Sequence, residues 1–120
     1  MLVAAGAAPP GWSQNWTPDA ATIAKLEASI KPGDIPRWGN AHAPVVADYA
    51  PYYSGTTETG ERFILAEFVV ADIDAVKPGI YIVRDRKSFP EILDGGCGVV
   101  NIVYSVKSGR IVSLVCNGWA

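Results

Sequence analysis

The chain has few residues of the kinds that bind metals. Its 120 residues include two cysteines, one histidine and one methionine. One histidine and two separated cysteines do not have the spacing that closes a zinc site. Asp72 and Asp74 could offer oxygen ligands, but the glycine and glutamate of a calcium loop are missing at the required positions. We therefore expect no metal ion and no cofactor.

Charge is also scarce. Charged residues make up 18% of the chain, with 10 basic and 12 acidic residues and a formal net charge of -2. No run of Lys or Arg could neutralise a series of phosphates, so we expect no nucleic-acid partner. No stretch approaches the roughly 20 apolar residues that cross a bilayer, so we expect no membrane partner. A G-x-S-x-G elbow is missing as well, which removes the commonest hydrolase signature.

Hydrophobic residues, at 49%, are abundant enough for a packed core. The length fits one domain, and we expect residues 17–120 to form a single α+β domain. Residues 1–16 are expected to be a flexible lead. Its apolar first ten residues, ending Ala-Gly-Ala-Ala-Pro-Pro, look like the remnant of a secretory signal. This favours a periplasmic or secreted protein over the alternative, a cytosolic chain with an alanine-rich N-terminus.

A helix is predicted from about residue 18 to residue 30. Thr17 offers an N-cap hydroxyl, and Pro18 suits the first helical position. Ile23, Leu26 and Ile30 recur at spacings of three and four, which gives one apolar stripe.

Strand patterns follow the helix. Residues 45–70 read as a hairpin, with Gly60 in the left-handed position of its loop. Residues 80–84 are a third strand, and residues 99–116 are a second hairpin. Its two apolar sets share a face if Ile102 lies opposite Leu114 and Val100 opposite Cys116, a register that requires a three-residue loop. We expect an α+β fold, with one N-terminal helix packed on a curved antiparallel sheet of about five strands.

This order of elements resembles the cystatin-like and nuclear-transport-factor-like group, in which a helix lies across a curved antiparallel sheet. The resemblance covers most of the chain and implies a fold. The Gln-x-Val-x-Gly hairpin of the cystatin inhibitors is not present, so protease inhibition of that kind does not carry over. The chain also resembles small exported bacterial proteins of unknown function, which implies no site residue.

Cys97 and Cys116 have three interpretations: a disulfide, two inert thiols, or a nucleophile that uses His42 as its base. In a regular ladder Cys97 would lie too far from Cys116 for the roughly 5.5 Å between Cα atoms that a bridge prefers. The neighbouring glycines permit the bend that would bring the two together. The expected exported location favours the disulfide.

Aromatic residues mark the predicted contact surface. Tyr49, Tyr52 and Tyr53 lie on a segment that Pro51 places at a sheet edge or a bulge. Tyr52 and Tyr53 are adjacent, so they face opposite sides of the strand and at most one is in the core. We predict contact through these tyrosines and through the preceding loop, which carries Trp38 and His42.

Glu67 lies in the middle of an apolar strand. A carboxylate there is paired, solvated or, inside a pocket, able to act as a general base. Together with Tyr81, Asn101 and Ser113 it would form a polar set on one face, which suits a binding pocket or a dimer face.

The sequence favours a small exported, non-catalytic binding protein, such as an inhibitor or immunity-type protein that acts through protein–protein contact, or a module for a small ligand. The alternative is a small pocket enzyme, an isomerase, dehydratase or hydrolase, with Glu67 or His42 as acid/base. A third interpretation is a homodimer, in which the domain covers its second sheet face with an identical copy.

Overall fold

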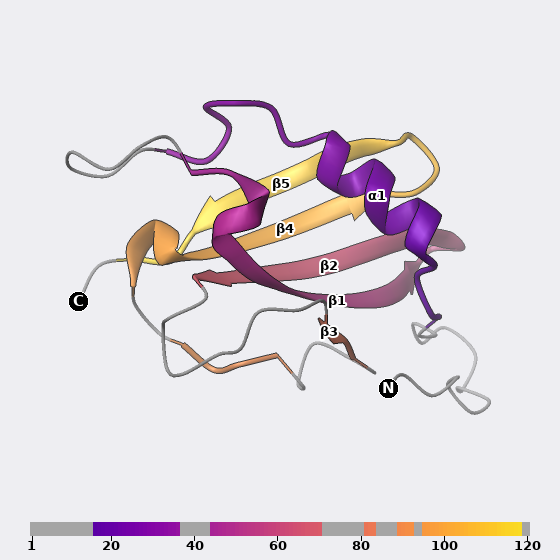
Figure 1. The fold of residues 1–120 in the computed structure, drawn as a ribbon. Coiled ribbons are helices and arrows are strands. Elements are labelled where there is room, and N and C mark those ends of the chain that lie inside the picture. The colour runs from indigo at the N-terminus through magenta and orange to yellow at the C-terminus, as the bar shows by residue number, and fades with distance from the viewer. Residues whose placement is uncertain (1–15, 37–43, 71–80, 84–88, 93–94, 119–120) are drawn as a thin grey trace.

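The computed structural model describes residues 16–36, 44–70, 81–83, 89–92 and 95–118. This part of the chain contains a helix, α1 (Ala20–Ala28), and four long antiparallel strands: β1 (Tyr49–Glu58), β2 (Glu61–Val70), β4 (Val99–Ser105) and β5 (Arg110–Cys116). Figure 1 shows α1 lying across one face of the sheet. The predicted α+β class with an antiparallel sheet is therefore confirmed.

The short strand β3 (Tyr81–Ile82) departs from the expected meander. It pairs in parallel with β1, and the order across the sheet is β3-β1-β2-β4-β5. A parallel neighbour requires a crossover instead of a tight turn, and the sequence pattern of residues 80–84 carries no sign of strand direction. The curvature of the sheet and a full-length fifth strand stay predictions.

Helix α1 is shorter than the sequence predicts and begins at a different cap. Asp19, not Thr17, is the N-cap, and its Oδ1 accepts a hydrogen bond of 2.7 Å from the amide of Thr22. Thr and Asp are both good caps, so the pattern alone did not separate them. The helix ends at Ala28, two residues before Ile30. Within the described residues, no helix has the length and apolar character that a membrane span requires.

The β1–β2 hairpin turns through a two-residue loop, Thr59 and Gly60. The last strand pair is Glu58 with Glu61, and both loop residues have positive φ, 48° for Thr59 and 83° for Gly60. A two-residue loop with two positive φ angles matches the right-handed twist of the flanking strands. The predicted left-handed position of Gly60 is confirmed, whereas Thr59 is a β-branched residue in the same region.

The β4–β5 hairpin has the predicted register over most of its length. Ile102 lies opposite Leu114, and Val100 lies opposite Cys116. The loop is one residue longer than predicted, because the register shifts between Val103 and Tyr104 and the last pair is Ser105 with Arg110. A β-bulge adds one residue to one strand, and the period-2 pattern on either side of it does not reveal it.

The core lies between α1 and the sheet face beneath it, which we name the inner face. Ile23 and Leu26 of α1 pack there with buried strand residues. The strand residues of this core are Tyr49, Tyr53, Ile64, Ala66, Phe68, Val100, Ile102 and Tyr104. Because side chains alternate along a strand, the residues between them lie on the opposite side, the outer face.

Trp16, which the sequence analysis assigned to the lead, packs against β1. Its Nε1 donates a hydrogen bond of 2.9 Å to Thr56 O, and the Arg62 guanidinium lies 4.9 Å from the centroid of its ring. Gly55 makes room for this contact, since a Cβ there would lie 2.2 Å from Trp16 O. The packed domain therefore includes Trp16; residues 1–15 of the predicted lead lie outside the described residues.

Candidate functional site

The tyrosines of the predicted contact surface divide between the two sheet faces. Tyr49 and Tyr53 belong to the core, 6% and 0% exposed, and both rings contact Phe68 at centroid distances of 5.9 Å. Tyr52 lies on the outer face, where its ring meets Phe89 edge-on. The expectation that at most one of Tyr52 and Tyr53 is core is confirmed. Tyr49 and Tyr53 are not surface contact residues, because α1 covers their side of β1.

The hydroxyl groups of the two core tyrosines are hydrogen-bonded. Tyr49 Oη donates to Cys97 O over 2.6 Å, and Tyr53 Oη donates to Glu27 Oε2. Burial and, second, the negative charge of Asp48 raise the pKa of Tyr49 to about 12. Burial, reinforced by Glu27, raises the pKa of Tyr53 well above its usual range. The hydroxyl groups of Tyr49 and Tyr53 are therefore protonated and uncharged in the core.

The rest of the predicted contact surface is only partly described. Trp38 and His42 lie outside the described residues. β1 is not an edge at Tyr52 and Tyr53, because β3 pairs with it there and β2 pairs with its other side. The strand at the end of the described sheet opposite β3 is β5.

Cys97 and Cys116 form a disulfide, with 4.6 Å between their Cα atoms. The bend that makes this possible is η4 (Gly96–Gly98), a single turn of 3-10 helix before β4. Gly95 and Gly96 have φ angles of 104° and 55°, a region that glycine enters without the steric penalty of a Cβ. A bridged sulfur is neither a nucleophile nor a metal ligand, so the bridged state has no Cys/His chemistry.

Glu67 lies on the outer face beside a hollow of about 360 Å³. It is 8% exposed and lies in register with Tyr52 on one side and Asn101 on the other. Asn101 Nδ2 donates to Asn117 Oδ1 over 2.8 Å, and Asn117 Nδ2 donates to Ile92 O over 2.7 Å. These bonds fix the two amides, so the hollow has a rigid polar wall next to a carboxyl group.

An apolar hollow of about 330 Å³ adjoins the polar one. Its lining includes Leu65, Phe89, Val103, Ser113 and Val115, and it shares Phe89 and Asn101 with the polar hollow. Asn101 and Ser113 thus lie on the same sheet face as Glu67, as predicted. For Tyr81, the structure describes the backbone, which pairs with Tyr52. The combined surface could hold a ligand that has one polar and one apolar end.

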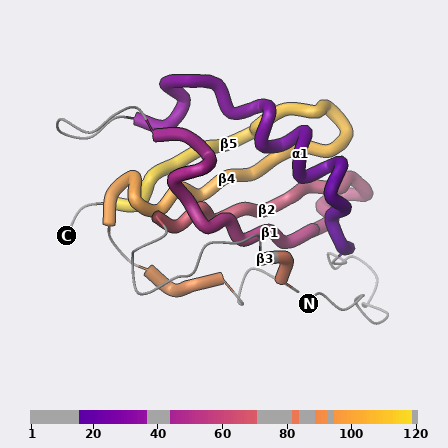
Figure 2. The backbone as a smooth tube through the Cα atoms, viewed as in Figure 1, coloured from indigo at the N-terminus to yellow at the C-terminus, as the bar shows by residue number. Residues whose placement is uncertain are grey.

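A larger cavity, of about 790 Å³, lies between α1, the segment that follows it and β5. Figure 2 shows that segment passing alongside β5. We name this cavity the basic groove: its cationic residues are Lys25, Lys31 and Arg110, and its apolar residues include Tyr104, Ile111 and Leu114. Sequence reasoning missed it, because Arg110 lies far from Lys25 and Lys31 in the chain and no run of basic residues marks the three.

The outer side of β5 is the most exposed apolar part of the described sheet. Val112 is 62% exposed and Val115 is 57% exposed. The alternation of β5 was read from the sequence, but its position at the end of the sheet was not, since strand order depends on which segments pair. β5 therefore differs from the other described strands in combining exposed apolar side chains with a position at the end of the sheet.

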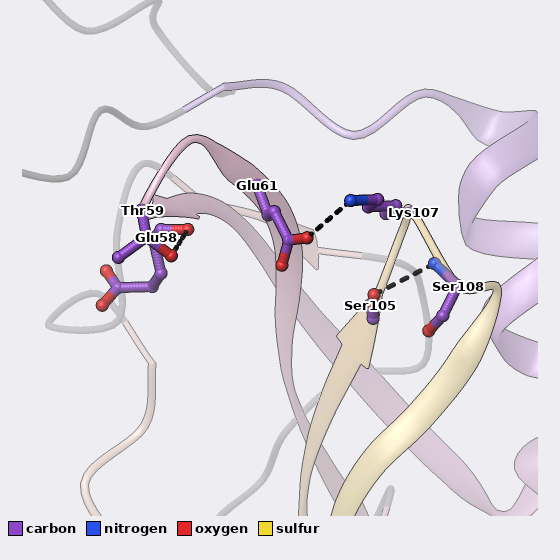
Figure 3. Close-up of polar contacts among 6 residues, drawn as sticks. All are labelled: Glu58, Thr59, Glu61, Ser105, Lys107 and Ser108. Carbon is purple, nitrogen blue, oxygen red and sulfur yellow. Dashed lines mark hydrogen bonds and ion pairs between the residues drawn. The ribbon is translucent and has the colours of Figure 1, made fainter.

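The β4–β5 loop is joined to the neighbouring hairpin by an ion pair and to the end of its own strand β4 by a hydrogen bond. Lys107 Nζ lies 3.1 Å from Glu61 Oε1, and the amide of Ser108 donates to Ser105 Oγ over 3.2 Å (Figure 3). The ion pair is exposed, so its energetic contribution is small. Its effect is to position the loop next to the start of β2.

In the parts of the chain that the structure describes, no three His, Cys, Asp or Glu residues gather as metal ligands would. A comparison of the chain with known protein families, curated proteins and solved structures gives no match.

Proposed function

We propose that the chain is a small exported, non-catalytic binding domain that holds a segment of another protein as an added strand along β5. The exposure of Val112 and Val115 on this terminal strand carries the proposal. Soluble proteins usually protect such strands with charged residues, proline or a covering element. β5 has one charged residue, Arg110, and no proline. An extended segment can pair with the backbone of such a strand and bury its exposed valines.

Export is supported by the disulfide. Bridges such as Cys97–Cys116 form and persist mainly in oxidising compartments, including the periplasm and the extracellular space. The apolar, small-residue N-terminus favours the same location. We therefore propose that the protein is periplasmic or secreted.

Inhibitors and immunity-type proteins are one form that such a binding domain can take, because blocking an enzyme requires contact and no chemistry. The order of elements resembles the cystatin-like group, and we propose that the sheet is curved as in that group. The motif hairpin of cystatins is missing, so the contact we propose uses a different element, β5.

The test is selection of binding peptides from a random display library, followed by affinity measurements on two variants. Val115→Lys places a charge on the outer side of β5, whereas Val45→Lys makes the same change at a 48% exposed valine outside the sheet. We expect Val115→Lys to weaken the selected peptides at least tenfold and Val45→Lys to leave them unchanged. Hydrogen exchange should slow in residues 110–116 on binding. Binders that are indifferent to Val115→Lys and protect other strands would disprove the proposal.

The buried carboxyl group of Glu67 beside a hollow favours a second candidate, a small pocket enzyme with Glu67 as acid/base. The test is a screen of isomerase, dehydratase and hydrolase substrates with the wild type and Glu67→Gln. Turnover that disappears in Glu67→Gln, while its unfolding midpoint is kept, would support the enzyme. Turnover that survives the substitution would remove Glu67 from any such role.

A further inference from the structure

The two sides of β5 offer different chemistry to an added strand. On the inner side lies the basic groove, with Ile111 and Leu114 at its apolar base. On the outer side lie the exposed Val112 and Val115. Val112 also borders a hollow of about 590 Å³ that is lined in part by Phe63. A strand that pairs with β5 would send alternate side chains to these two sides.

The charge of the basic groove is opposite to that of the whole chain. Lys25 comes from α1, Lys31 from the segment after it and Arg110 from the start of β5. The acidic residue of the lining is Asp34, whose Oδ2 already accepts a hydrogen bond of 2.7 Å from the amide of Lys31. The groove therefore has an excess of two positive charges, three cations against one carboxylate, in a chain whose net charge is -2.

The cations are available to a partner. Lys31 Nζ is 3.5 Å from Ala28 O, a long contact at the end of α1. Within the described residues, neither Lys25 nor Arg110 forms an ion pair, and both are exposed. Glu27 of α1 accepts a hydrogen bond from Tyr53 in the core, and Asp19, the N-cap of α1, interacts with Lys25 electrostatically without forming an ion pair. Carboxylates of a partner could therefore approach the positive charges of the groove without displacing an existing ion pair of Lys25 or Arg110.

We propose that the partner segment is an extended peptide in which acidic and apolar residues alternate. This inference rests on the proposed function, since it requires that β5 takes up a strand. The acidic side chains point into the basic groove, toward Lys25, Lys31 and Arg110, and the apolar side chains cover Val112 and Val115 on the outer side. Electrostatic complementarity of this kind sets the orientation and specificity of a docked strand.

The test uses three synthetic eight-residue peptides: alternating Val and Glu, alternating Val and Lys, and the Val-Glu peptide with every amide N-methylated. Fluorescence anisotropy with the intact chain should show the Val-Glu peptide binding at least tenfold more tightly than the Val-Lys peptide. The N-methylated peptide, which cannot donate to the β5 backbone, should lose binding. The double variant Lys25→Glu/Arg110→Glu should reverse the preference, whereas Lys107→Gln, which removes a charge outside the groove without creating repulsion with Glu61, should keep it.

The outcomes separate this inference from the function on which it rests. Equal binding of the Val-Glu and Val-Lys peptides, with loss of binding for the N-methylated Val-Glu peptide, would overturn the acidic partner and leave strand addition intact. Tight binding of the N-methylated peptide would overturn strand addition. Sedimentation that shows a dimer with β5 protected from hydrogen exchange, and no peptide binding, would assign the edge to a second copy of the chain and overturn both.

Discussion

Reduction of the Cys97–Cys116 disulfide should destabilise the domain by about 3 kcal/mol. The bridge spans 19 residues of sequence, and the chain-entropy relation for a closed loop of that length gives about 3 kcal/mol at 25 °C. A domain of this size has a total stability of roughly 6–18 kcal/mol at 0.05–0.15 kcal/mol per residue. The reduced protein should therefore remain folded at 25 °C but with a clearly smaller margin.

The assay is urea unfolding of the oxidised protein and of the same protein kept in a phosphine reductant. With a urea m-value of about 1–3 kcal/mol/M, the midpoint should fall by about 1–3 M. The double variant Cys97→Ala/Cys116→Ala is the control, because reductant should not move its midpoint. Alkylation in denaturant should label no thiol until reductant is added.

Two results would contradict this reasoning. If both thiols of protein purified from an oxidising compartment react without reductant, the bridge does not form in solution, and the Cys97 nucleophile with His42 as base returns as a hypothesis. If the bridge forms but its reduction shifts the free energy of unfolding by much less than about 1 kcal/mol, the unfolded chain is already compact around this loop.

Three further predictions concern the hairpin turn, the core tyrosines and the contact of Trp16. Thr59→Asn should raise the free energy of unfolding by about 1 kcal/mol, since Asn tolerates the positive φ at this position; a lower urea midpoint would contradict it. The stability that the two core tyrosines contribute should be fully present below pH 10 and decline as the pH rises through about 12, because the raised pKa values of Tyr49 and Tyr53 make unfolding release protons in that range; Tyr49→Phe should make the decline shallower, and an unchanged profile would refute the contribution of Tyr49. Gly55→Ala should cost about 2 kcal/mol by displacing Trp16, while Gly118→Ala, which has open space around it, should not shift the midpoint; equal midpoints for the two variants would refute the contact.

The sequence was sufficient for the pairing of residues that are close along the chain. Apolar alternation on both sides of a short loop predicted the contact of Ile102 with Leu114, because one slip of register would have exposed the whole apolar set. It could not give the loop length, since the bulge at Val103/Tyr104 leaves the alternation on each side unchanged.

The candidate surface was not predictable from the sequence in the same way. Both faces of β1 and β2 are rich in apolar residues, so the pattern could not tell which face α1 covers. The placement of Tyr49 and Tyr53 in a contact surface was wrong for that reason: α1 covers their face, and the edge at Tyr52 and Tyr53 is paired with β3. The position of β5 at the end of the sheet and the basic groove depend on long-range packing, on which local periodicity has no bearing.

The covalent and polar contacts around β5 bear directly on its proposed role. At its C-terminal end, Cys116 is bridged to η4, and the amide of Asn117 donates to Val99 O over 2.9 Å. At its N-terminal end, the amide of Gly109 donates to Ser105 O over 2.9 Å. A flexible segment loses conformational entropy when a partner orders it, and that loss weakens binding. Because both ends of β5 are already fixed, a docked strand would have to order only itself. The disulfide therefore both stabilises the domain and keeps β5 ordered for the proposed binding of a strand.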